Sequence, residues 1–242
     1  MTTYRQGCTN KAVVQEIQRA VGCYPDGIWG RLTTESVKAW QQAHGLTPDG
    51  IVGPKTLEAM ASQKTTGSPQ TAVNKDSVLI ESGDGSVVRL KRSKRQIDAL
   101  VVHCTATPEG RNMTVDELRR QHKKQGWADI GYHYVIDLDG HILTGRDVDI
   151  SGAHVSGHNA HTIGIVYVGG LNSRQKAMDT RTDAQRRALR TLLESLRLLY
   201  PTAAIKGHRD YSPDLDHDGQ ITSREWIKAC PCFNAATEYA DI

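Results

Sequence analysis

Two short, uninterrupted apolar runs constrain the fold of this chain more than any other feature. They are "ALVV", residues 99–102, and "IGIVYV", residues 163–168. A strand covered on both faces gives such a continuous apolar run, as in the parallel sheets of α/β proteins. Helical patterns alternate with these runs, so we predict an α/β fold from about residue 78 onward, with a mixed central sheet flanked by helices.

Local signals mark the ends of the flanking helices and the turns. Capping boxes run from Thr114 to Glu117 and from Thr182 to Gln185, and each predicts a helix start. The second of these helices carries an apolar stripe of leucines and ends before a proline. The stripe comprises Leu189, Leu192, Leu193, Leu196 and Leu199. Hairpin turns are predicted at two Asp-Gly pairs, Asp84-Gly85 and Asp139-Gly140.

The first sixty or so residues contain an internal repeat. "PDGIWG" at residues 25–30 is repeated as "PDGIVG" at residues 48–53, and Asp49 follows Asp26 by 23 residues. Each copy predicts a turn followed by a helix, and an amphipathic helix precedes both copies. We therefore predict a small N-terminal three-helix domain. The double signature over residues 10–61 resembles the peptidoglycan-binding modules of cell-wall hydrolases.

A small, polar segment containing Pro and Gly separates the repeat from the rest of the chain. This composition is typical of a linker. The predicted organisation is a peptidoglycan-binding helical domain at residues 1–62, a linker at 63–77 and a catalytic domain at 78–242.

Composition excludes several classes of function. The net charge is +3, and no dense run of basic residues argues for nucleic acid. A mild positive charge favours approach to an anionic polymer such as a cell wall. The chain begins without a signal-peptide pattern, and no window approaches a membrane span. We expect a monomer without membrane insertion, made in the cytoplasm and acting on the wall after release or export. The nearest basic cluster, which we interpret as a solvated segment, is Arg89, Lys91, Arg92, Lys94 and Arg95.

The five cysteines cannot all pair with one another within one chain. Cys8 and Cys23 either form a disulfide within the N-terminal region or remain two reduced thiols. Near the C-terminus, "KACPC" places Cys230 and Cys232 two residues apart. That segment is compatible with a disulfide partner, a redox pair, a zinc ligand or packing thiols.

Two histidines follow predicted buried strands, where a sheet presents side chains to a crevice. They are His103 after "ALVV" and His208 after "AAIKG". Together with Cys230 they would make a three-ligand zinc site with one open position, the form of a catalytic site. From the residues alone, a core cysteine and chance placement of the histidines remain open alternatives.

Five ordered motifs carry a resemblance to a known family. They are "VVHCTAT", "GYHYVIDLDG", "GAHVSGHNAHTIGIVYVGG", "GHRD" and "KACPCF", from about Ile97 to Phe233. This order resembles the zinc-dependent N-acetylmuramoyl-L-alanine amidases of the phage-lysozyme type, which are relatives of the peptidoglycan recognition proteins. The resemblance implies the amidase fold and hydrolysis of the amide between N-acetylmuramic acid and L-alanine in peptidoglycan, as in endolysins.

The resemblance also implies roles for individual residues. It implies zinc on His103, His208 and Cys230, with Tyr132 and Lys228 assisting catalysis. His154 and Asn159 resemble the substrate-facing loop of the family. Cys104 and Cys232 are interpreted as packing thiols, and His158 and His161 as solvated loop residues. His133 is expected to face the opposite side of its strand from Tyr132 and not to be a ligand.

An insertion between "GHRD" and "KACPC" departs from the family pattern. "DLDHDGQITSRE", residues 214–225, matches the ligand positions of an EF-hand loop. The predicted calcium ligands are Asp214, Asp216, Asp218, the Gln220 carbonyl and Glu225, with Thr222 at the ninth loop position. The alternative is an acidic surface loop that binds no ion tightly.

Three other functions account for parts of the sequence. A non-catalytic peptidoglycan recognition protein would share the fold, but such relatives typically lack the cysteine ligand that Cys230 supplies. A thiol hydrolase would use Cys104 as its nucleophile and would not need a metal. A pure calcium-binding module would explain only the insertion.

Overall fold

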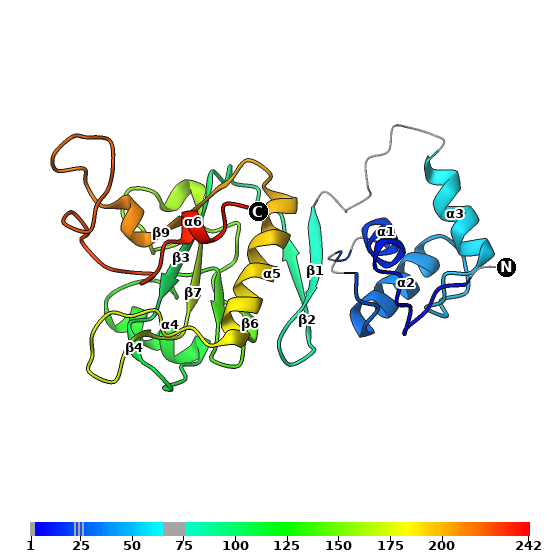
Figure 1. Ribbon diagram of the computed structural model, residues 1–242, viewed down its shortest axis with the longest axis horizontal. Helices are drawn as coiled ribbons and strands as arrows, with labels where there is room; N and C mark the ends of the chain where they lie inside the picture. Colours follow the sequence, from blue (N-terminus) through cyan, green and yellow to red (C-terminus); the bar gives the residue numbers. More distant parts are fainter. Residues whose placement is uncertain (1–2, 22, 24, 26, 65–75) are drawn as a thin grey trace. The chain divides into compact units, whose positions relative to one another are not determined.

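The computed structural model describes residues 3–21, 23, 25, 27–64 and 76–242 (Figure 1). The chain divides into two compact units. One consists of Met1–Glu81 with Arg89–Lys91, and the other of Ser82–Val88 with Arg92–Ile242. Most of the predicted linker lies outside the described residues, and the predicted domain limits stay predictions.

The N-terminal unit contains the three predicted helices. They are α1 (Lys11–Val21), α2 (Arg31–Ala43) and α3 (Pro54–Lys64). They pack around a small apolar core, which consists of Val14, Ile17, Trp29, Val37 and Val52. Downstream, β1 (Ser77–Glu81) and β2 (Val87–Lys91) form a two-stranded sheet, with Gly85 of the predicted turn at a φ of +75°.

Two buried glutamines organise the internal repeat in the same way. Gln18 and Gln41 are 23 residues apart, and each is 1% exposed. Each side chain accepts a hydrogen bond from the glycine of its turn and donates to a carbonyl and a threonine hydroxyl, at 2.8–3.2 Å. The partners are Gly27, Ile28 and Thr33 for Gln18, and Gly50, Ile51 and Thr56 for Gln41. Each repeat is thus fixed by a polar side chain that the sequence analysis did not single out.

The second unit contains the predicted mixed sheet, with strand order β6-β5-β7-β3-β9. β5, β7, β3 and β9 run parallel, and β6 pairs antiparallel with β5 at one edge. The strand bounds are β3 Ala99–Cys104, β5 Tyr134–Ile136, β6 Ile142–Thr144, β7 Thr162–Tyr167 and β9 Ala204–Gly207. β3 and β7 are buried along their whole length, as their apolar runs predict. The α/β fold class is therefore confirmed.

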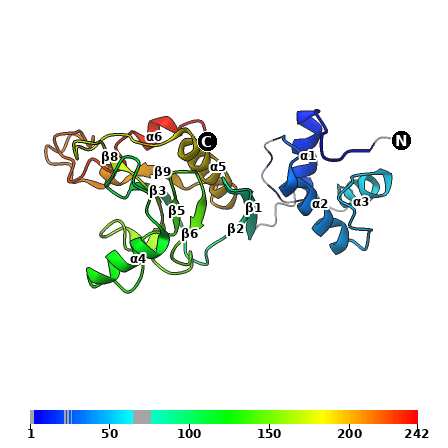
Figure 2. The ribbon, with the colours of Figure 1, turned by 90° about the horizontal axis from the view of Figure 1, so that it is seen from below.

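Helices cover this sheet and begin at the predicted caps. Figure 2 shows the strands between α4 (Val115–Lys124) and α5 (Asp183–Leu199). Both helices start with a complete capping box, at Thr114 and at Thr182. The five predicted leucines of α5 are fully buried. Short elements complete the unit: β4 Thr107–Pro108, η1 Asn159–His161, β8 Gly170–Leu171, η2 His208–Tyr211 and α6 Ala235–Glu238.

A buried arginine ties the C-terminal segment to the loop before α5. The Arg181 guanidinium donates to Asp179 at 2.9 Å and to Glu238 of α6 at 2.8 and 2.9 Å. It also lies 3.2 Å from the centroid of the Phe233 ring. A buried guanidinium requires such partners, because an unpaired buried charge is strongly destabilising. This network therefore fixes Phe233 and α6 against the loop before α5.

Among residues 3–21, 23, 25, 27–64 and 76–242, no helix is both long enough and apolar enough to cross a membrane.

We predict that Asp179→Asn makes the protein less stable at neutral pH but not in acid. Burial alone would raise the pKa of Asp179, but hydrogen bonds from Arg181 outweigh it and hold the pKa below the ordinary value of 3.8. A lowered pKa in the folded state stabilises the fold above the unfolded-state pKa, and this contribution disappears as the pH falls through the folded-state value. The variant should lose about 1–3 kcal/mol near neutral pH in urea unfolding, and the difference from wild type should shrink below about pH 4.

Asp98→Asn is the matched control, because the Asp98 side chain is 57% exposed. It should change stability by less than about 1 kcal/mol at any pH. A difference between wild type and Asp179→Asn that is independent of pH would contradict the assigned role of the Arg181 network.

Candidate active site

Strand register brings the two predicted histidine ligands together. β3 and β9 are parallel neighbours, with Val102 paired to Gly207. His103 directly follows Val102, and His208 directly follows Gly207. The two histidines therefore lie at the same level, at the carboxyl ends of neighbouring strands. Their ring centroids are 4.7 Å apart.

The segment that carries Cys230 docks against this edge through backbone and side-chain hydrogen bonds. The Arg209 amide donates to the Cys230 carbonyl at 2.9 Å, and the Tyr167 hydroxyl donates to the Pro231 carbonyl at 2.7 Å. The Cys104 amide donates to the Cys230 sulfur at 3.2 Å. These contacts place the thiol beside the two imidazoles, although more than twenty residues separate Cys230 from His208.

A glycine makes room for this docking. A Cβ atom at Gly207 would lie 2.6 Å from Cδ of Pro231, which is closer than a carbon–carbon contact allows. Gly207 is also the last residue of β9 and immediately precedes His208. The same residue therefore lets the Cys230 segment approach and sets the place of the second imidazole.

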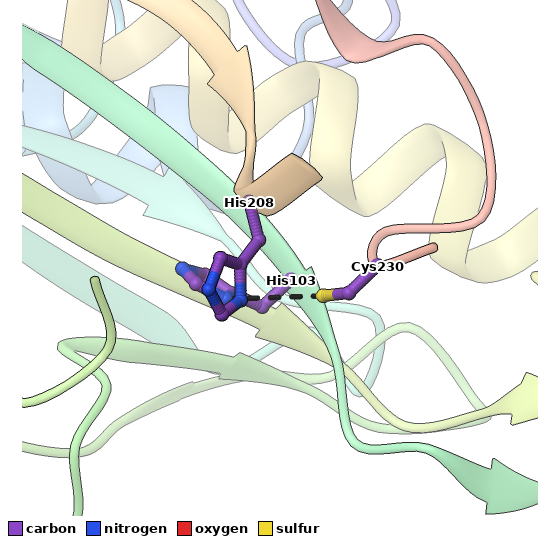
Figure 3. Close-up of side chains that lie close together, drawn as sticks. All are labelled: His103, His208 and Cys230. Carbon is purple, nitrogen blue, oxygen red and sulfur yellow. Dashed lines mark hydrogen bonds between the residues drawn. The ribbon is translucent and has the colours of Figure 1, made fainter. Parts of the chain in front are cut away.

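The donor set of the resulting cluster fits a zinc ion. Nitrogen atoms of His103 and His208 and the sulfur of Cys230 all lie within 4.8 Å of one another (Figure 3). Nδ1 of His103 is 3.8 Å from the Cys230 sulfur. Two imidazoles and one thiolate are ligands that zinc prefers, and three protein ligands leave a position for substrate or water.

The charge states also suit a metal site. Burial, followed by the fields of His154, His208 and Lys228, lowers the pKa of His103 well below its usual value. Burial and then Lys228 lower the pKa of His208 to about 4. Both imidazoles are therefore neutral near pH 7, and each keeps a lone pair for a cation.

Tyr132 and Lys228 border the cluster. The Tyr132 ring centroid is 5.1 Å from that of His103, and burial raises the pKa of this partly buried phenol, which therefore stays protonated. Lys228 is exposed, and its charge acts on both His103 and His208. The structure thus brings both residues to the predicted site from different parts of the chain.

His154 and Asn159 are engaged within the protein. His154 is 7% exposed, and its Nδ1 lies 3.0 Å from Nε2 of His103. Oδ1 of Asn159 accepts the backbone amides of His154 and Val155, at 2.8 and 3.0 Å. These contacts hold the loop and do not direct either side chain toward a ligand, so the predicted substrate contacts stay predictions.

The remaining histidines of the motifs have structural surroundings. His133 is fully buried, and its Nδ1 accepts the Gly164 amide at 2.9 Å. His158 lies against the Tyr211 ring, with centroids 4.6 Å apart. The His161 side chain is 58% exposed.

The cysteine contacts argue against a thiol nucleophile. Cys8, Cys104, Cys230 and Cys232 carry free thiols. Sulfur atoms of Cys104 and Cys232 are 3.8 Å apart. A hydrogen bond with Cys230, together with burial, raises the pKa of Cys104 to about 12. Only the thiolate is a strong nucleophile, so Cys104 is a packing thiol at neutral pH.

The acidic insertion forms a compact loop. Carboxylate oxygens of Asp214, Asp216 and Asp218 lie within 4.8 Å of one another, and Gly219 has a φ of +83°. Glu225 is 7% exposed and accepts hydrogen bonds from the Leu215 and Thr222 amides, at 2.8 and 2.7 Å. Oδ1 of Asp214 is buried and has no hydrogen-bond partner among the described residues. Exposed acidic clusters are common without an ion, so calcium binding stays a prediction.

Comparison with known proteins identifies the second unit. Residues 93–231 match the family model "N-acetylmuramoyl-L-alanine amidase". The chain belongs to the N-acetylmuramoyl-L-alanine amidase family. The amidase is thus an enzyme, and it hydrolyses peptidoglycan. Residues 11–60 match a second model, "Putative peptidoglycan binding domain".

Relatives of the amidase include phage endolysins. It is 37% identical to the endolysin of Klebsiella phage KP32 over 149 residues, which are 61% of this chain and 89% of that protein. It is 37% identical to the endolysin of Escherichia phage T7 over 143 residues, which are 59% of this chain and 85% of that protein. Among solved structures, the endolysin and N-acetylmuramoyl-L-alanine amidase LysCS from Clostridium intestinale is 29% identical, with a TM-score of 0.46, over 60% of this chain and 81% of that chain.

We predict that Gly207→Ala impairs the amidase by moving the Cys230 segment. The added methyl group would collide with Pro231, and overpacking of this kind typically costs about 1–3 kcal/mol. Hydrolysis of purified peptidoglycan should fall at least about tenfold, because a small misplacement of a catalytic group has a large effect on rate. Urea unfolding and turbidity clearance would measure the two effects.

Gly53→Ala is the control for the added methyl group. No atom lies within 4 Å of the Cβ position at Gly53, and its φ is not positive. It should leave stability and hydrolysis close to wild type. If Gly207→Ala hydrolyses peptidoglycan at the wild-type rate, the activity does not depend on the placement of the Cys230 segment by its contact with Gly207.

Proposed function

We propose that the enzyme cleaves the amide between N-acetylmuramic acid and L-alanine with a zinc ion held by His103, His208 and Cys230. The convergence of these three ligand atoms within 4.8 Å is the observation that supports the proposal most directly. Burial keeps both imidazoles neutral, which is the state that binds a metal. When bound, zinc lowers the pKa of water toward about 7 and polarises the carbonyl of the scissile amide.

The protein groups around the site supply positioning and charge. Lys228 is an exposed ammonium group whose charge reaches both histidines. We assign it the stabilisation of the negative charge that develops on the amide oxygen. Tyr132 carries a phenol that stays protonated and lies against His103, so it can donate a hydrogen bond or pass a proton to the leaving nitrogen.

Substitutions at these two positions should lower the rate and leave metal binding intact. Lys228→Met and Tyr132→Phe remove the charge and the hydroxyl but keep the approximate size of each side chain. Each should reduce turnover about 10²-fold or more, because each removes an interaction made mainly in the transition state. Zinc content after dialysis, measured by atomic absorption, should match wild type.

Lys228→Arg is the matched control for the ammonium group. It keeps the positive charge and should retain more activity than Lys228→Met. Equal loss in both variants would contradict a role based on charge.

Mass spectrometry of digested peptidoglycan would test the bond that is cut. The expected products are intact stem peptides that begin with a free L-alanine amine, and a zinc chelator should abolish them.

The alternative, a recognition protein that binds without cutting, predicts no new termini with or without the chelator. Endolysin relatives and the Cys230 ligand favour the enzyme. Products that persist without metal and vanish in Cys104→Ser would instead support a thiol hydrolase.

The N-terminal unit is proposed to retain the enzyme on the wall. It matches a peptidoglycan-binding family, and endolysin relatives support the cell wall as the place of action. We propose a monomer that lyses the wall in the manner of an endolysin, after release or export from the cytoplasm where it is made.

We further propose that the insertion binds calcium through Asp214, Asp216, Asp218, Gln220 and Glu225. Support comes from the match to EF-hand ligand positions and from the buried Oδ1 of Asp214, which has no hydrogen-bond partner in the part of the chain that the structure describes. An ion would stiffen the loop between His208 and Lys228. A calcium-selective chelator should therefore lower the melting temperature of wild type but not that of Asp214→Asn/Asp216→Asn. An unchanged melting temperature in wild type would eliminate calcium.

A further inference from the structure

A line of hydrogen bonds runs behind His103, on the side away from Cys230. Nε2 of His103 lies 3.0 Å from Nδ1 of His154. Nε2 of His154 lies 3.3 Å from the Thr162 hydroxyl, and that hydroxyl lies 2.9 Å from the His158 carbonyl. The line therefore begins at a proposed zinc ligand and ends at a backbone acceptor.

The last link fixes the direction of every other link. A carbonyl oxygen only accepts, so the Thr162 hydroxyl donates its single proton to His158. The Thr162 oxygen must then accept from Nε2–H of His154. A neutral imidazole has one N–H, so Nδ1 of His154 carries a lone pair and accepts from Nε2–H of His103. The remaining nitrogen, Nδ1 of His103, is left with its lone pair on the side of Cys230.

The protein builds a close-fitting slot for the His154 ring. A Cβ atom at Gly164 would lie 2.5 Å from Cδ2 of His154, and one at Gly152 would lie 2.4 Å from the same atom. The Asn159 side chain holds the backbone of His154 from the other end of the loop. The ring is 7% exposed and cannot turn without displacing backbone.

We propose that His154 is a positioning residue that, together with Thr162, holds His103 in its Nε2–H tautomer and so presents Nδ1 to the zinc ion. This inference rests on the proposed zinc site. Metal-bound histidines generally donate their second N–H to a fixed acceptor, which sets the ring orientation and strengthens the metal bond. Here the acceptor is another imidazole, whose own tautomer is set by a threonine and a backbone carbonyl.

The tautomer is directly measurable in the metal-free protein. Long-range ¹H–¹⁵N correlation spectra of the wild-type chain should show His103 and His154 as neutral rings protonated at Nε2. This measurement needs no activity and no variant, so it stands even if substitutions impair folding. A His103 ring protonated at Nδ1 would overturn the proposal, because that nitrogen could then not bind a metal.

Two substitutions separate the effect of the acceptor from that of the packing. His154→Asn keeps an oxygen near the place of Nδ1, whereas His154→Leu removes the acceptor and keeps a similar volume. Loss of an outer hydrogen bond typically weakens metal binding about 10–100-fold. We expect that loss in His154→Leu and a smaller one in His154→Asn, measured by competition with a chromogenic zinc chelator. Circular dichroism would establish that both variants fold.

The other outcomes are equally informative. Wild-type zinc affinity in His154→Leu would overturn the proposal, as would equal weakening in both variants. Wild-type protein that binds no zinc would defeat the proposed metal site, while the tautomer spectra would still report on the hydrogen bonds themselves. Thr162→Val should allow a mixture of His154 tautomers in those spectra, and Thr162→Ser should not.

Discussion

The pairing of β3 with β9 is the constraint on which the active site depends. Parallel strands present their carboxyl ends at one edge, and the register of Val102 with Gly207 sets His103 and His208 at the same height. A shift of one residue in either strand would turn one imidazole to the opposite face of the sheet. The apolar side chains that fill both faces of β3 therefore determine the position of the polar site at the end of the strand.

The third proposed ligand is positioned differently, because the Cys230 segment belongs to no strand or helix. Its position depends on individual contacts with Tyr167, Arg209 and Gly207, and on the Arg181 network beyond it. Such a segment tolerates a long insertion between His208 and Lys228, since loop length adds little to the free energy of closing a loop. The acidic loop is thus compatible with the same site geometry as a much shorter connection.

The sequence predicted what depends on local patterns. Continuous apolar runs indicated β3 and β7, the capping boxes indicated α4 and α5, and the strand-end rule indicated His103 and His208. It could not indicate contacts made only in the folded chain. The place of His154 behind His103 follows from packing between segments 51 residues apart, so neither residue type nor spacing reveals it. Gln18 and Gln41 did give a signal, because they recur at the 23-residue interval of the repeat, but their buried hydrogen bonds form only in the folded domain. Thr162 gave one weak signal, a hydroxyl at the start of a buried strand.

His103 shows why the surroundings on both sides of a proposed metal ligand matter. One ring nitrogen faces the Cys230 sulfur and the other faces His154, so a single proton decides whether the first nitrogen has a lone pair. In a solvated imidazole the two neutral tautomers interconvert through water. In a ring that is 1% exposed, the nearest fixed acceptor decides. The line through His154 and Thr162 ends at a backbone carbonyl, which cannot reverse its role, so the fold itself selects the nitrogen that is open to a cation.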